Sequence, residues 1–263
     1  MRPNEKRQPR KLPSVGRPAV SLHLLALLVL CGGCSVPIRT GLGAPREPAV
    51  NPDEAVEASA RAYETGNPDE AKRLIRNARD AVTANPGEEQ QLARTLTSIA
   101  VTQSEKGDNA EAIDLHEEAL ALRESALGAD HAEVAESLSF LAAAYYQAQR
   151  YDEAEDAFRR ALEVRKQVFG PDDRVTGLSM NNLAFFYAGV GRYDEADPLF
   201  RESIRIISES PDATWSEKAR ALDNYAAMLL DAGRTEEADA IQKESAQYRS
   251  KKRQVEDIIR MTK

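Results

Sequence analysis

The residue types that most often bind metals are few in this sequence. Its histidines are His23, His116 and His131, and no pair of them has metal-ligand spacing. In two later copies of a repeat described below, phenylalanine occupies the position of His116. We therefore predict that His116 lies in the core. His131 stands at a predicted helix start, which indicates a cap or surface role. We therefore expect no metal site and no cofactor.

Carboxylates are abundant, but their positions are unfavourable for acid–base catalysis. They cluster where helices are predicted to start, and there the helix dipole favours solvated acids. A catalytic acid–base pair would need burial, which helix starts rarely provide. The sequence also has no Gly-x-Ser-x-Gly motif and no glycine-rich phosphate loop. We expect no catalytic residue and no enzyme activity. The two main clusters are Asp152, Glu153, Glu155 and Asp156, and Asp194, Glu195 and Asp197.

The cysteines, Cys31 and Cys34, lie at the end of an N-terminal apolar run. Residues 2–17 are basic and polar, residues 19–30 are nearly all apolar, and Cys31-Gly32-Gly33-Cys34 follows. A basic segment, a short apolar stretch and small residues before a cleavage point are typical of an export signal. The apolar stretch is short for a membrane-spanning helix, which needs about 20 residues.

This segment resembles a bacterial lipoprotein signal, in which small residues precede a cysteine that is lipidated. The resemblance implies a signal peptide over residues 1–33 and lipidation of Cys34, for example with palmitate. Cys31 departs from the family, which usually has leucine or another apolar residue there. An uncleaved anchor and an ordinary soluble export signal are the alternatives. Ser35 implies delivery to the outer membrane facing the periplasm, with retention in the inner membrane as the alternative.

Residues 34–52 contain several prolines and glycines, which predict a flexible tether. The whole chain has a formal charge of −8, and residues 34–263 alone carry −13. An acidic body of this kind repels nucleic acid and, taken as a whole, anionic lipid. We therefore expect no nucleic-acid partner.

The rest of the chain contains a repeat with a step of 42 residues. Alanine, glutamate and glycine recur in one register, and each unit has apolar residues at helical spacing on both sides of a turn. The recurring alanines indicate that two helices approach closely, which leaves no room for a longer side chain. The matching positions include Ala112, Ala154, Ala196 and Ala238; Glu111, Glu153, Glu195 and Glu237; and Ala100, Ala142, Ala184 and Ala226.

These motifs resemble tetratricopeptide repeats of the longer, kinesin-light-chain type. The resemblance covers residues 53–250 and implies an all-α fold, a right-handed superhelical solenoid of helix pairs. We place the units at about 53–87, 88–130, 131–172, 173–214 and 215–250. Without proline or glycine after Gly233, the last helix is expected to run to about Arg260, so that residues 251–263 form a capping helix.

The resemblance also implies a concave groove lined by the first helix of each unit. Asn182 and Asn224 match a position where the family often uses asparagine to bind the backbone of a peptide, and an amide both donates and accepts. The alternative is that the asparagines only join neighbouring helices and that Phe140 and Phe185 face the next unit. The predicted groove residues are Asn181, Asn182, Asn224, Phe140, Tyr146, Phe185, Arg94 and Arg220.

The sequence therefore predicts a non-catalytic protein-interaction scaffold, anchored by lipid in the bacterial cell envelope. Its partner is a protein or peptide whose identity the sequence does not define. The alternative function is self-association into an oligomer through the convex face or the last helix.

Overall fold

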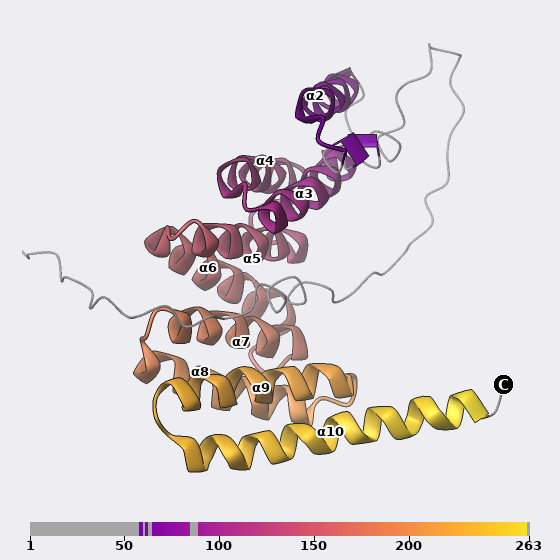
Figure 1. Cartoon of the computed structure of the whole chain (residues 1–263). Helices are drawn as coiled ribbons and strands as arrows, with labels where there is room; N and C mark the ends of the chain where they lie inside the picture. The colour runs from indigo at the N-terminus through magenta and orange to yellow at the C-terminus, as the bar shows by residue number, and fades with distance from the viewer. Residues whose placement is uncertain (1–57, 60, 63–64, 85–88, 262–263) are drawn as a thin grey trace, which may run out of the picture. The chain divides into compact units, whose positions relative to one another are not determined.

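The computed structural model describes residues 58–59, 61–62, 65–84 and 89–261, and these contain helices and no strand (Figure 1). The predicted signal peptide, Cys34 and the tether lie outside the described residues. The labelled helices are α2 (Pro68–Ala84), α3 (Glu89–Lys106), α4 (Asn109–Leu127), α5 (Ala132–Gln147), α6 (Tyr151–Phe169), α7 (Arg174–Gly189), α8 (Tyr193–Glu209), α9 (Trp215–Asp231) and α10 (Thr235–Met261).

The helices from α3 to α10 form four consecutive pairs, and each pair packs against the next. Every first helix (α3, α5 and α7) also contacts the first helix of the following pair. The second helices (α4, α6, α8 and α10) make no such contact with one another within 8 Å between Cα atoms. The first helices therefore lie on the side of the stack where successive units are closest together.

The turn inside each pair depends on one residue with a left-handed backbone. Three of these residues are glycines, Gly107, Gly191 and Gly233, with φ of 87°, 77° and 75°. The fourth is Gln149, with φ of 61°, and it is the only non-glycine with positive φ in the described part of the chain. In each turn, the next N–H donates to the carbonyl five residues earlier, as from Arg192 to Tyr187, which closes the end of the first helix.

The alanines of the 42-residue step are buried where the two helices of a unit meet. Ala112, Ala154, Ala196 and Ala238 are all 0% exposed, which confirms the predicted close approach. Around them the core forms one large cluster from Ile113 to Ala238 and a second from Ala62 to Ala119.

Helix α10 is longer than its partner α9. Near the start of α9, Trp215 stacks on Tyr248 of α10, and α10 continues from there to Met261, about 20 Å at 1.5 Å per residue. Residues 251–261 therefore continue the last repeat helix, which ends close to the expected Arg260. Gln242 is exposed on α10, whereas His116, Phe158 and Phe200 are buried at the equivalent positions, so the stack ends on a polar face.

Candidate functional site

The predicted groove residues lie on the first helices, in positions that recur along the stack. Phe140, Asn182 and Asn224 are separated by 42 residues each and occupy equivalent positions on α5, α7 and α9. Phe185 lies one turn after Asn182 on α7. Phe140 and Phe185 are half-buried, and Phe140 stacks on the buried His116 with ring centroids 5.7 Å apart. The structure thus aligns four of the predicted residues along the first helices.

The two asparagines of this row have no hydrogen-bond partner within the described part of the chain. Asn182 is half-buried and Asn224 is 6% exposed, and the amide atoms of neither residue are fully buried, so both amides can be reached from solvent. Each amide therefore has a donor and an acceptor that a polar ligand could use.

Asn181 lies inside the structure. It is 1% exposed, and no donor reaches its Oδ1. At the equivalent position of the next unit, Asp223 accepts a hydrogen bond from Ser245 at 2.6 Å and pairs with Arg249, both on α10. This repeat position therefore faces the second helix of its own unit, on a different side from Asn182.

Tyr146 contributes to packing between units. Its ring meets Phe186 of the next first helix at 6.0 Å, edge to face, and lies 5.9 Å from Tyr151. A side chain at Gly189 would clash with the Tyr146 hydroxyl, so the glycine makes room for the tyrosine. Burial raises the pKa of Tyr146. The structure gives this residue a contact with the following unit.

Arg94 and Arg220 are not brought together. They belong to α3 and α9, which make no contact with each other. Arg94 is exposed and lies 3.9 Å from Glu133, whereas Arg220 is half-buried. A peptide with a free C-terminal carboxylate is a minor alternative ligand for such a groove, and two arginines this far apart along the stack cannot both bind that one carboxylate.

Arginines at the start of the second helices connect neighbouring units. Arg192 pairs with Glu195 in its own unit and with Glu155 in the preceding one, and Arg234 pairs likewise with Glu237 and Asp197. The hydrogen bonds from these arginines lower the pKa of Glu195 and of Glu237. The sequence interpretation did not predict these pairs, although an arginine followed three residues later by glutamate does recur with the 42-residue step.

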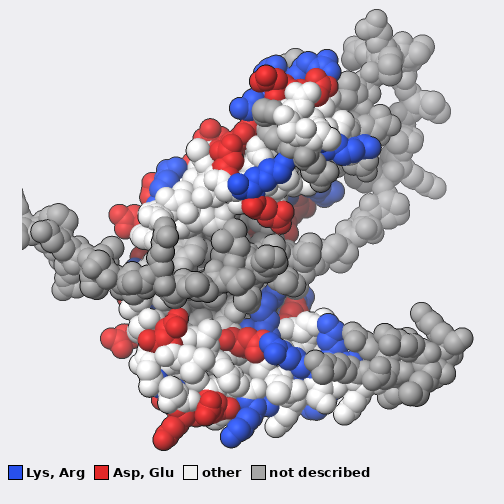
Figure 2. Space-filling model, viewed as in Figure 1, with Lys and Arg blue, Asp and Glu red and all other residues white. Residues whose placement is uncertain are grey.

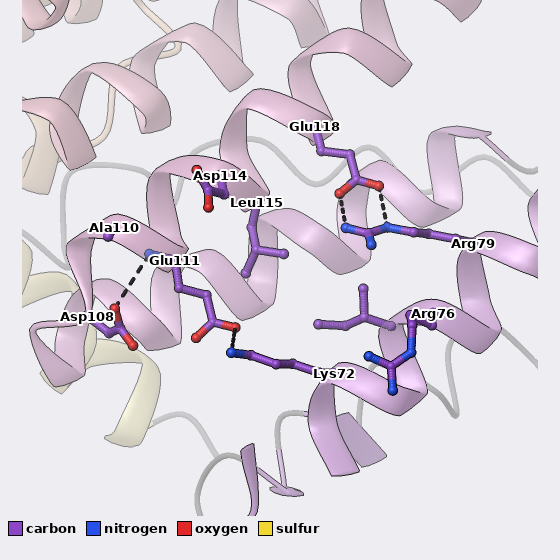
Figure 3. Close-up of a pocket in the computed structure, with 10 residues that line it drawn as sticks. Lys72, Arg76, Arg79, Asp108, Ala110, Glu111, Asp114, Leu115 and Glu118 are labelled. Atoms are coloured by element: carbon purple, nitrogen blue, oxygen red, sulfur yellow. Dashed lines mark hydrogen bonds and ion pairs between the residues drawn. The ribbon is translucent and has the colours of Figure 1, made fainter. Parts of the chain in front are cut away.

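A charged cleft lies between α2 and α4, at the N-terminal end of the described helices (Figure 3). Arg79 pairs with Glu118, and Lys72 lies 3.6 Å from Glu111, so ion pairs cross the cleft at two places. Arg76 lies between them without an ionic partner in the described residues. Within those residues no group of three or more His, Cys, Asp or Glu is arranged to hold a metal ion, and no helix is long and apolar enough to cross a membrane.

Stacked helix pairs with this turn geometry define a helical repeat solenoid. A tetratricopeptide-repeat family model matches residues 58–125, 105–167 and 173–251, and the chain belongs to this family. Proteins of the family are generally non-catalytic scaffolds for protein interaction. No curated protein matches the sequence.

Solved structures share the fold, and two examples show how closely. One is BtubC (BKLC) from P. vanneervenii, with a TM-score of 0.64 and 18% identity over 76% of this chain and 80% of its own. The other is a putative kinesin light chain from Podosopora anserina with nearly identical TPR-like repeats. It has a TM-score of 0.63 and 18% identity over 80% of this chain and 100% of its own. These likenesses agree with the predicted kinesin-light-chain type of repeat.

Proposed function

We propose that the chain is an envelope scaffold that binds an extended peptide segment of a partner protein along its first helices. The observation that carries the proposal is the pair of amides at Asn182 and Asn224. They occupy the same repeat position on α7 and α9, and neither has a partner within the described residues. Each can donate to a peptide carbonyl and accept from a peptide N–H.

The surroundings of these amides support a peptide as the ligand. The first helices lie where successive units are closest, which is the side on which a curved stack of helix pairs becomes concave. The half-buried rings of Phe140 and Phe185 offer apolar surface beside the amides. Backbone hydrogen bonds would give affinity, and contacts of the peptide side chains with these rings would give selectivity.

A photo-crosslinker at the Asn182 position tests the peptide site in isolated envelopes. We expect discrete adducts from this position, and we expect Asn224→Ala to weaken them severalfold because it removes the neighbouring amide. The matched control carries the crosslinker at Asn77 on α2, which is half-buried on a different helix. Equal adducts from both positions, or adducts insensitive to Asn224→Ala, would refute the peptide site.

We further propose that Cys34 is lipidated and holds the scaffold at the outer membrane facing the periplasm. The support is the sequence of the N-terminal segment, with Gly32 and Gly33 before the cysteine. Labelled palmitate should enter the full chain and its Cys31→Ser variant, and it should not enter Cys34→Ser. Labelling that persists in Cys34→Ser would contradict the assignment, and separation of inner from outer membranes tests the location.

A further inference from the structure

An aromatic pair, exposed Trp215 and half-buried Tyr248, lies where the start of α9 meets α10. Trp215 is the only tryptophan in the chain, is 38% exposed, and stacks on Tyr248 with centroids 5.9 Å apart and planes at 28°. The equivalent residues of the two preceding units are Asp173 and His131, which cap the N-termini of α7 and α5. The packing of the repeat therefore does not require an aromatic residue at this position.

Two lysines lie over the same rings. The Nζ atom of Lys251 is 5.4 Å from the Trp215 ring and 5.5 Å from the Tyr248 ring, and that of Lys218 is 5.8 Å from Trp215. Lys218 also donates to the Ser208 carbonyl at 2.8 Å. Neither lysine has a carboxylate partner in the described part of the chain. Two uncompensated cations are thus held beside exposed aromatic surface.

The α9 start is itself firmly positioned. Thr214 caps the helix, and the Glu217 carboxylate accepts a hydrogen bond from the Thr214 backbone N–H at 2.8 Å. Glu217 is 5% exposed and pairs with Arg174 of the preceding unit, so its charge is neutralised inside the protein. The cap and this ion pair therefore hold the start of α9, and with it Trp215 and Lys218, in a defined position.

This end of the molecule differs in charge from the rest. Residues 243–263 contain seven basic and three acidic residues, a net charge of +4, whereas residues 34–242 carry −17. Figure 2 shows acidic side chains near the start of α10. Salt screens exposed charges beyond about 8 Å, so the distant acidic units do not cancel the local positive field.

We propose that the start of α9 and the second half of α10 dock onto an anionic lipid bilayer. Tryptophan and tyrosine favour the boundary between lipid and water, and each lysine near an anionic surface adds attraction. The sequence continues α10 with Val255, Ile258 and Ile259 at spacings of three and four, a pattern typical of helices that lie in that boundary. This surface does not include Asn182 or Asn224. The proposal of lipid docking is therefore tested independently of peptide binding.

Trp215 is the natural probe, because no other tryptophan contributes to the emission. The full chain is titrated with vesicles of phosphatidylcholine alone and of phosphatidylcholine with phosphatidylglycerol. An N-terminal lipid or apolar segment would tether the chain to both, so only docking of this surface gives a blue shift specific to the anionic vesicles. We expect Lys218→Ala and Lys251→Ala each to weaken this response about fivefold.

Lys166→Ala on α6 is the matched control, because it removes one positive charge elsewhere in the stack, and it should respond like the wild-type chain. Circular dichroism establishes that every variant keeps its helicity. An equal shift with neutral vesicles, no shift, or a shift insensitive to both lysines would overturn the proposal. So would a lysine-dependent shift caused by soluble polyglutamate but not by anionic vesicles, which would assign the surface to an acidic protein partner.

Discussion

At the scale of single residues, His116 is a buried titratable group whose pKa is strongly shifted. It is 3% exposed and stacks on Phe140, and Phe158 and Phe200 occupy its position in the next two units. Burial, assisted by the nearby charge of Arg123, lowers its pKa from 6.5 to about 4. The prediction of a core position for His116 is confirmed, and so is the role of His131, which caps α5.

This shift predicts a loss of stability in mild acid. The unfolded chain takes up the His116 proton near pH 6.5, whereas the folded chain resists it down to about pH 4. The contribution of the neutral His116 to the free energy of unfolding is therefore fully present above pH 6.5. It falls by about 3 kcal/mol as the pH is lowered toward 4. Replacing His116 with phenylalanine should remove this part of the loss, measured by urea unfolding at several pH values.

His131→Asn is the control for the pH experiment, because asparagine retains an acceptor at the N-cap of α5. This variant should keep the acid-induced loss. If His116→Phe loses as much stability between pH 6.5 and 4 as the wild-type chain does, burial of the neutral imidazole is not the cause.

At the scale of helices, Gly177 determines how closely α7 approaches α8. A side chain there would lie 2.9 Å from Cγ2 of Ile206 and 3.2 Å from Cγ1 of Ile207, both on α8. Ser203 of α8 also donates to the Gly177 carbonyl at 2.8 Å. In the last unit the equivalent residue is Ala219, and its carbonyl accepts from Ser245 at 3.2 Å. The glycine is therefore specific to the α7–α8 pair.

We predict that Gly177→Ala destabilises the protein by about 1 kcal/mol, although alanine is the better helix former. The steric cost should shrink in an Ile206→Ala background, because the clashing methyl group is then absent, and a double-mutant cycle measures this coupling. The converse change, Ala219→Gly, should also destabilise, through helix propensity alone. A stabilising Gly177→Ala would show that α8 moves aside at no cost.

At the scale of the molecule, the core of the described residues has two large clusters that meet at α4, and a small third cluster of Leu178, Ile207 and Ala221. The N-terminal cluster includes Leu96, which is 0% exposed, and the larger one includes Phe200, also 0% exposed. Contacts in a repeat stack link only neighbouring units, so local damage need not spread. Each cluster should therefore be able to open separately.

Hydrogen exchange measures this separation. Leu96→Ala, which costs about 2–5 kcal/mol locally, should accelerate exchange in α3 and α4 and leave α7 to α9 protected. Phe200→Ala should do the reverse. If both variants raise exchange uniformly over the described helices, the stack unfolds as one cooperative unit.

The sequence by itself determined the repeat, its step and its pairing into helices. These features follow from local rules, because alanine, glycine and apolar spacing recur wherever a helix must turn or pack closely. The same logic placed His116 in the core and the second-helix alanines at the closest approach.

Only the tertiary structure decided which way individual side chains face. Asn181 and Asn182 are adjacent in sequence, yet one lies inside its unit and the other joins the row on the first helices. Tyr146 packs against Phe186, and Trp215 meets Tyr248 more than thirty residues away. Such contacts depend on the angle and distance at which whole helices meet, and these are set by the packing of both partners together.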